Sequence, residues 1–280
     1  MRPFRVLTTM ALGLLAPACS SSTSQVCQGC GSQPWLVEDF SEYSSTSQFL
    51  SDPRGIYELG SDQNTGQMTL DKSVGYGTLT QSLRYDVPDR TGDTSSRCGD
   101  LTIRRDLTLP SQVTEVWVEL EVKFVSNWSD IAPSSWSCSS APDYKFFFGG
   151  VVNVTGRFEE HLGARGAGDF GFGAPDPSGY ENFDQAHGGL NGSHTTAASI
   201  FDGQWHQHRL HFRLDSPTSA SVQFWLDGVK RFDVTGLKVT NTGTPLLYKV
   251  VLGANLNQGP GQAQSYWWGK VNVWNTNPGW

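Results

Sequence analysis

An alternation of apolar and polar residues with a period of two recurs along the chain and limits its fold more than any other feature. The clearest example is 115–124, where every even position is apolar and the odd positions after Glu115 hold Trp117, Glu119, Glu121 and Lys123. Such alternation is typical of a β-strand with one buried face. No stretch repeats apolar residues at spacings of three and four for more than about two turns, so the sequence predicts no substantial helix.

Further strands follow from the same pattern. We expect clear strands at 143–148, 205–214, 221–228 and 266–274, and weaker ones at 67–71, 78–86, 101–109 and 246–252. Turn residues separate them, and Asp227-Gly228 is a strong hairpin signal. The Gly-rich stretch 163–192 has no clean period and is interpreted as a long loop over one face. This order favours an all-β fold, an antiparallel two-sheet β-sandwich.

The first residues have the features of an export signal. A basic start at 1–5 precedes a weakly apolar run at 6–18, which is shorter than the roughly 20 residues that a membrane-spanning helix needs. Leu15-Ala-Pro-Ala-Cys19, followed by serines, resembles a bacterial lipoprotein signal in which Cys19 would be lipidated. The alternative is cleavage near Ala18 and a secreted protein. We expect a bacterial cell-envelope or secreted location, with membrane contact through the lipid anchor alone.

The sequence after this signal, which occupies 1–19, divides into a tether and a domain. Residues 20–34 are rich in Ser, Gln and Gly, as a flexible tether would be, and 35–280 suffices for a single domain with a substantial core. The net charge of −7 argues against nucleic acid as a partner, because binding phosphates requires a basic face. We expect a monomer.

Four cysteines remain besides Cys19, an even number that suits an oxidising compartment. Cys98 and Cys138 both lie in Ser-rich stretches that resemble loops, and we predict that they form a disulfide. Cys27-Gln-Gly-Cys30 has the spacing of a redox or zinc motif, but it has neither a second such motif nor a strand–helix context. A local disulfide or two free thiols is the favoured interpretation.

Three segments together carry a resemblance to a known fold. Asp202-Gly-Gln-Trp-His206, a strand, and then Phe224-Trp-Leu-Asp-Gly228 are similar to paired strands shared by laminin-G-like domains, glucanases and polysaccharide lyases. Glu38-Asp-Phe40 resembles the usual opening strand, and the ending from 252 to 280 resembles polysaccharide-lyase-like jelly rolls. The resemblance, over about 35–280, is to the concanavalin A-like lectin/glucanase jelly roll. It implies the fold and leaves the activity open, because one fold hosts many functions.

Two enzyme families of this fold can be compared motif by motif. The Glu-x-Asp-x-x-Glu motif of family 16 glucanases is absent, and its nearest counterpart, Glu119-Leu-Glu121, lacks the central Asp and the third carboxylate. A retaining glucanase is therefore not expected. The segment from Tyr248 to Gln258 resembles the Tyr-Phe-Lys-Ala-Gly-Val-Tyr-Asn-Gln motif of family 7 alginate lyases. However, Leu256 stands where that family has its catalytic Tyr, and no Gln-Ile-His strand is present, which puts that family's mechanism in doubt here.

A lyase that acts on a uronic acid polymer needs a group that neutralises the carboxylate, a base for the C5 proton and an acid for the leaving oxygen. Arg209, His211 and Arg213 alternate on one strand face about 7 Å apart, which would place a base between two cations. The alternative is an ordinary polar sheet face with solvated cross-strand pairs. Tyr144 and Tyr248 are further candidates for the acid or a carboxylate clamp. The predicted catalytic residues are Arg209, His211, Arg213, Lys145 and Tyr266.

Aromatic side chains on the polar face of a strand are candidate platforms for sugar rings. Trp117 and Trp225 alternate away from the core positions, whereas of Trp267 and Trp268 one is expected to be in the core. The predicted substrate-binding residues are Trp117, Glu119, Glu121, Trp225 and Tyr248.

The sequence predicts no metal site and no cofactor. His161, His187 and His194 are scattered through segments interpreted as loops, without the spacing of metal ligands, and His206 is interpreted as a structural residue at the edge of its strand. Calcium is a common ligand of this fold, and Asp39 with other loop acids could bind it, but nothing resembles a defined calcium loop.

Three functions remain open from the sequence. The first is a surface or secreted protein that acts on a polysaccharide, with lyase-type elimination on an acidic polysaccharide as the specific enzyme hypothesis. The second is a carbohydrate-binding module without catalysis. The third is an adhesion protein that binds another protein through the sandwich.

Overall fold

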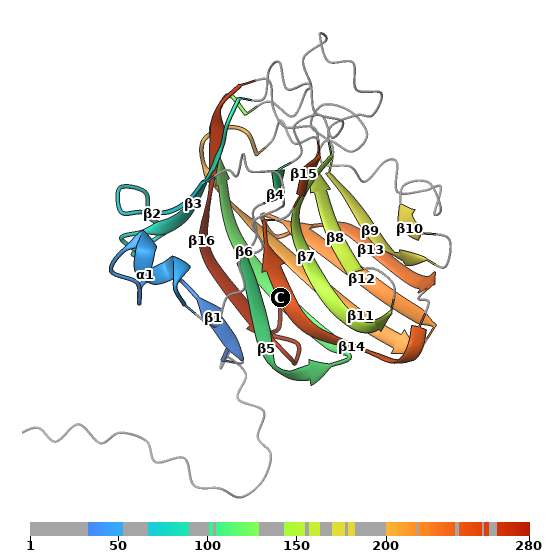
Figure 1. Ribbon diagram of the computed structural model, residues 1–280. Coiled ribbons are helices and arrows are strands. Elements are labelled where there is room, and N and C mark those ends of the chain that lie inside the picture. The colour runs from blue at the N-terminus through green and yellow to red at the C-terminus, as the bar shows by residue number, and fades with distance from the viewer. Residues whose placement is uncertain are drawn as a thin grey trace, which may run out of the picture. The chain divides into compact units, whose positions relative to one another are not determined.

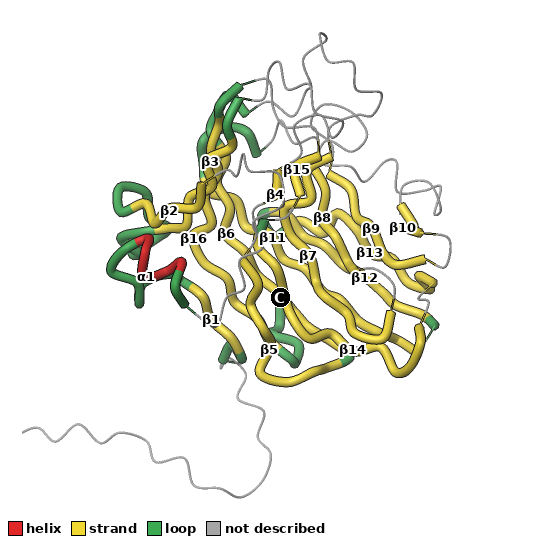
Figure 2. Tube along the Cα trace, in the orientation of Figure 1, coloured by secondary structure: helices red, strands yellow, loops and turns green. Residues whose placement is uncertain are grey.

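The computed structural model describes residues 33–52, 67–89, 101–102, 105–128, 143–154, 157–162, 170–176, 179–182, 200–216, 218–238, 241–253, 255–257 and 262–280. The described residues all belong to one compact unit, Ser32–Trp280. Strands dominate the described residues, and their one helix is the short α1 (Thr46–Leu50), which begins at the N-cap Ser45 (Figure 2). None of the described helices is long and apolar enough to cross a membrane.

Two antiparallel sheets form the two layers of this unit (Figure 1). Sheet A has the order β13 (Val229–Lys238), β12 (Ser219–Leu226), β11 (Trp205–Ser216), β6 (Glu115–Phe124), β16 (Gln264–Trp274), β3 (Ser82–Val87) and β2 (Gln67–Asp71), and β1 (Leu36–Glu38) also pairs with β16. Sheet B has the order β10 (Gly179–Asn182), β9 (Phe170–Asp176), β8 (Arg157–Leu162), β7 (Asp143–Val154), β14 (Asn241–Leu252) and β5 (Arg105–Val113). β15 (Asn255–Asn257) pairs with β7 and with β4 (Leu101–Thr102).

The hydrophobic core lies between the two sheets. The even positions of β6 are buried there, as the alternation predicts, and sheet B contributes Phe147 and Val250. The rings of Phe147 and Phe212, one from each sheet, stack with centroids 6.2 Å apart. Each such buried side chain contributes about 1.5–3 kcal/mol to folding. The predicted all-β, two-sheet sandwich is therefore confirmed.

Several parts of the fold differ from the sequence-based expectation. The stretch 163–192, interpreted as one loop, contains β9 and β10. In β9 glycines alternate with Phe170 and Phe172, and because glycine carries no side chain the apolar and polar faces cannot be distinguished in the sequence. β13 lies outside the predicted strands, and β3 begins at Ser82, after a turn in which Leu79 N donates to Tyr76 O and Gly77 has φ +60°.

Candidate functional site

The structure divides the predicted site residues among three separate places. Seven of them lie on the outer face of sheet A: Trp117, Glu119, Glu121, Arg209, His211, Arg213 and Trp225. Lys145 and Tyr248 belong to sheet B, on β7 and β14, and Tyr266 lies in the core. Arg209 and His211 therefore lie in a different sheet from Lys145, and Tyr266 lies in the core.

The three residues of the predicted Arg–His–Arg triplet each contact a carboxylate. Arg209 Nε lies 2.9 Å from Glu119 Oε2, directly across from it on β6. His211 Nε2 lies 2.6 Å from Glu115 Oε1. Arg213 Nε, on a side chain that is 48% exposed, lies 2.5 Å from Asp215 Oδ1. The arrangement matches the alternative interpretation, a polar sheet face with cross-strand pairs, and the catalytic role of the triplet stays a prediction.

Tyr266 cannot contact a polysaccharide in this fold. Its side chain is 2% exposed and its ring stacks on Tyr85 and Phe124, with centroids 4.9 and 5.5 Å away. Burial raises the pKa of the Tyr266 phenol above its usual value, so it stays protonated. The cause is the strand period, because Trp268 is the core member of the Trp267–Trp268 pair and Tyr266 shares its face.

The predicted sugar platform on sheet A is covered by another tryptophan. Trp117 is 7% exposed, and its ring stacks on His211 with centroids 3.7 Å apart. The ring of Trp280 stands edge-on to both Trp117 and Trp225, with centroids 5.1 Å away in each case. Trp225 remains partly exposed, and the ammonium of Lys230 lies 4.9 Å from its ring centroid.

Glu119 and Glu121 lie on the same outer face but in different environments. Glu121 is buried and accepts hydrogen bonds from Gln207 Nε2, at 3.0 Å, and from the Tyr76 hydroxyl. Burial raises the pKa of Glu121 to about 7, and the charge of Glu119 adds to this, against the two hydrogen bonds. Burial also raises the pKa of Tyr76 to about 12. Glu119 accepts hydrogen bonds from Asn272 and from Arg209.

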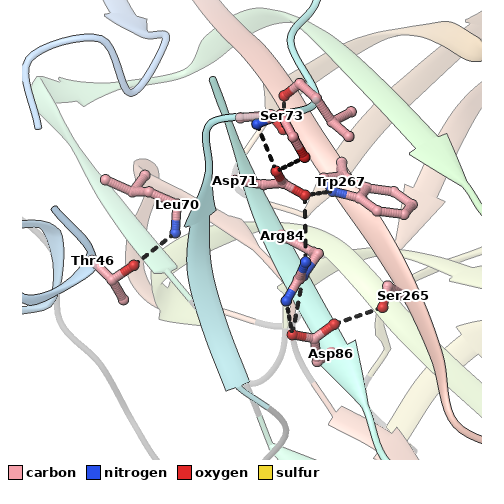
Figure 3. Close-up of polar contacts among 10 residues, drawn as sticks. Thr46, Leu70, Asp71, Ser73, Arg84, Asp86, Ser265 and Trp267 are labelled. Atoms are coloured by element: carbon pink, nitrogen blue, oxygen red, sulfur yellow. Dashed lines mark hydrogen bonds and ion pairs between the residues drawn. The ribbon is translucent and has the colours of Figure 1, made fainter. Parts of the chain in front are cut away.

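A second polar cluster occupies the outer face of sheet A where β2, β3 and β16 are adjacent (Figure 3). Asp71 accepts hydrogen bonds from Ser73 Oγ at 2.6 Å and from Trp267 Nε1 at 3.0 Å, and it forms an ion pair with Arg84 at 3.5 Å. Burial acts to raise the pKa of Asp71, but these hydrogen bonds and the charge of Arg84 hold it below its usual value. Arg84 also contacts Asp86. The polar groups of this cluster bond to one another, and these contacts connect β2, β3 and β16.

His206 connects two loops at one end of sheet A. Its Nδ1 lies 2.8 Å from Asp227 Oδ2 and its Nε2 lies 3.1 Å from Asp202 Oδ1. Burial acts to lower the pKa of His206, but the hydrogen bonds and charges of the two aspartates outweigh it, so that the pKa is raised. This geometry fits the structural role that the sequence predicts for His206.

Sheet B brings together residues that the sequence reasoning did not combine. Lys145 on β7 is paired in register with His161 on β8, and Tyr144 is paired with Leu256 on β15. His161 therefore lies in a strand, not in the expected loop; 157–162 carries adjacent polar residues that hide the alternation. Farther along the sheet, Lys249 Nζ lies 2.5 Å from Asp106 Oδ2 on β5 and 5.3 Å from the ring centroid of Tyr248.

Several predicted features lie outside the described residues. These are the lipidation of Cys19, the disulfide of Cys98 and Cys138, the state of Cys27 and Cys30, and the histidines His187 and His194. Asp39, the candidate calcium ligand, accepts hydrogen bonds from the backbone and hydroxyl of Ser41. In the described part of the chain, no group of three or more His, Cys, Asp and Glu residues could hold a metal ion.

Comparisons with known proteins support the fold. No protein-family model matches the sequence, and no curated protein matches it significantly. The structure is similar to a variant of alginate lyase Aly36B in complex with an alginate trisaccharide, with a TM-score of 0.55 and 12% identity over 88% of this chain and 99% of that one. It is also similar to the endo-β-1,4-glucuronan lyase of the fungus Trichoderma reesei, with a TM-score of 0.54 and 13% identity over 78% of this chain and 90% of that one.

A third similar structure is the alginate lyase vAL-1 from Chlorella virus, with a TM-score of 0.51 and 8% identity over 74% of this chain and 88% of that one. At these identities the likeness establishes the jelly-roll fold that the sequence resemblance implied.

Proposed function

We propose that the protein binds an acidic polysaccharide along the outer face of sheet B and cleaves it by β-elimination. The observation that carries the proposal is the register of sheet B, which aligns Lys145 with His161 beside β15. The outer face of sheet A supports the reaction less well, because each residue of its Arg–His–Arg triplet contacts a carboxylate of the same sheet. The solved lyases of this fold act on alginate or glucuronan, which supports the choice of substrate class.

The register supplies groups of the kinds that elimination requires. Positions paired across neighbouring strands share a face, so Lys145 and His161 occupy register positions on one face of the sheet. Asn255 directly precedes Leu256 in β15, and Leu256 is paired with Tyr144, the residue before Lys145. The same segment, from Tyr248 to Gln258, resembles the family 7 motif.

In the proposed reaction His161 takes the proton from C5 of a uronate unit, while the Asn255 amide stabilises the charge that develops on the carboxylate. The electrons of the C5–H bond form the C4–C5 double bond, and the bond between C4 and the glycosidic oxygen breaks. Lys145 donates a proton to that oxygen. The products are one shortened chain and one chain that ends in an unsaturated uronate.

A lysine that is paired with a carboxylate lies farther along sheet B. Gly150 on β7 is paired with Lys249 on β14, and the five residue steps from Lys145 to Gly150 span about 17 Å of strand. Asp106 on the neighbouring strand β5 contacts the ammonium of Lys249 and positions it beside Tyr248. Several uronate units of one chain would fit along this length of strand.

The test is to incubate the protein with alginate, glucuronan and heparin and to follow the ultraviolet absorbance of the unsaturated uronate. The wild-type protein is expected to raise the absorbance with at least one polymer. His161→Asn and Lys145→Met should each lower the rate by about 100-fold or more, as expected when a general acid or base is lost. Lys270→Met, which removes a cation from sheet A, is the matched control and should keep the rate.

Two results would count against this assignment. An absence of turnover with all three polymers would contradict the elimination, and retained binding in that case would leave carbohydrate recognition as the function. Unchanged rates in both sheet B variants would contradict the choice of face.

A further inference from the structure

The last six residues of the chain cross the outer face of sheet A, on the side of the molecule away from sheet B. β16 ends at Trp274, and the ring of Trp280 contacts Trp117 on β6 and Trp225 on β12. This path covers three strand spacings, about 14 Å, which six residues can reach. Gly279, at φ +92°, and its backbone hydrogen bond to Asn277 Oδ1 form the turn before Trp280.

Trp280 thereby fills a cage of aromatic side chains, which we call the aromatic cage. Its walls are Trp117, Trp225 and Trp274, whose ring centroids lie 5.1, 5.1 and 6.5 Å from that of Trp280. The guanidinium carbon of Arg209 lies 5.1 Å from the centre of the Trp280 ring. The cage thus holds one flat ring of about the size of an indole.

Polar atoms in and beside the cage are buried without hydrogen-bond partners. They are Nε1 of Trp117, Nε1 of Trp280 and, on the neighbouring position of β16, Oδ1 of Asn272. Trp117 and Asn272 are each 7% exposed. A buried donor or acceptor without a partner destabilises the structure relative to one that is satisfied. Trp280 therefore fills the cage but forms no hydrogen bond with the polar atoms of Trp117 and Asn272.

We propose that the aromatic cage is a binding site for a neutral pyranose unit, and that Trp280 occupies it when no sugar is bound. A pyranose ring presents flat C–H faces that stack on indole rings, and its hydroxyls can accept from Trp117 Nε1 and donate to Asn272 Oδ1. When Trp280 leaves, its own indole N–H gains water as a partner.

A neutral sugar suits the cage better than a uronate because the cationic groups around it are already paired. Arg209 contacts Glu119, His211 contacts Glu115 and Lys230 contacts Asp233. The site lies on the opposite sheet from the proposed elimination and does not depend on it. A neutral stretch of a glycan held here would anchor the protein on its substrate while sheet B remains free to act.

The test is calorimetric titration with cellohexaose, mannohexaose and laminarihexaose. Trp280→Ala opens the cage and should bind at least one of them about tenfold more tightly than the wild-type protein, because no side chain competes for the site. Adding Trp225→Ala to that variant should reverse the gain. Trp267→Phe, which alters an indole bound to Asp71 outside the cage, is the control and should bind as the wild type does.

A measurement on the wild-type protein guards against a variant that does not fold. In protein labelled with 5-fluorotryptophan, the fluorine resonance of Trp280, identified by its loss in Trp280→Phe, should move when a binding hexasaccharide is added. Folded Trp280→Ala that binds none of the three sugars would overturn the proposal. If that variant fails to fold, an unmoved Trp280 resonance at saturating concentrations of all three sugars would overturn it instead.

Discussion

At the scale of single residues, burial is the main determinant of whether Glu121 carries a charge. The carboxyl group lies under Tyr76 and Gln207, and burial raises its pKa from 4.5 to about 7. A raised carboxyl pKa means that the folded state binds the proton more tightly than the unfolded state. The contribution of this protonated carboxyl group to the stability of the fold is fully present below about pH 4.5 and is lost as the pH rises to about 7.

We predict that Glu121→Gln removes this pH dependence. The amide is neutral at every pH and resembles the protonated acid, so the variant should gain stability relative to the wild type above pH 7, by on the order of 3 kcal/mol. Urea unfolding of both proteins at about pH 5 and pH 8 measures the effect. Glu42→Gln, at an exposed position, is the control. Equal pH profiles for wild type and Glu121→Gln would contradict the account.

At the scale of the element, the edge strand β2 shows how one carboxylate secures several strands. Among the described strands β2 pairs with β3 alone, so one of its backbone edges has no described strand beside it in sheet A. Asp71 at its end contacts Arg84 on β3 and Trp267 on β16. The hydrogen bonds that depress the pKa of Asp71 therefore also hold the edge of the sheet in place.

Asp71→Asn should destabilise the protein by about 1–3 kcal/mol at neutral pH, because it removes an acceptor of charge-assisted hydrogen bonds. The lowered pKa of Asp71 gives stability that is present above pH 3.8 and is lost as the pH falls through the lowered value. The difference between variant and wild type should therefore shrink in acid. Thermal melting across this range is the measurement. Asp233→Asn, in an exposed pair with Lys230, should shift stability by less than about 1 kcal/mol.

The strands could be predicted wherever side chains alternate in polarity. The ranges 115–124 and 67–71 match β6 and β2. In these ranges the polarity of each side chain indicates whether it faces the core or the solvent. The site could not be predicted, since the sequence does not say which sheet a strand joins. Lys145 and Arg209 each lie in a predicted strand, yet the pairing order places them in different sheets. The Gly-rich strands could not be predicted for a different reason, because their glycines leave one face of the strand without side chains.

At the scale of the whole molecule, Arg105 joins the first strand and helix to sheet B. This β5 side chain is 1% exposed and lies 3.5 Å from both Glu38 on β1 and Asp52 after α1. It also donates to the Tyr43 hydroxyl at 2.9 Å, and its guanidinium lies 4.7 Å from the centre of the Phe49 ring. One buried cation therefore balances two carboxylates from residues 36–52.

Arg105→Met should be the most destabilising of these substitutions, by about 3–5 kcal/mol, because it leaves the buried carboxylates without their cation. Urea unfolding midpoints measure the loss. Arg213→Met removes an exposed arginine that contacts Asp215 and should cost less than about 1 kcal/mol. Comparable losses in the two variants would show that the buried cluster contributes no more than a surface ion pair.

The place of β16 in sheet A determines when the protein can fold during its synthesis. β16 is the last of the described strands in sequence order, yet it lies in the interior of the sheet, where it pairs with β1, β3 and β6. A nascent chain on the ribosome that has not yet released residues 264–274 cannot join β3 to β6. Sheet A is therefore completed only after translation has passed its final strand, and until then the earlier strands depend on chaperones or on their own solubility to avoid aggregation.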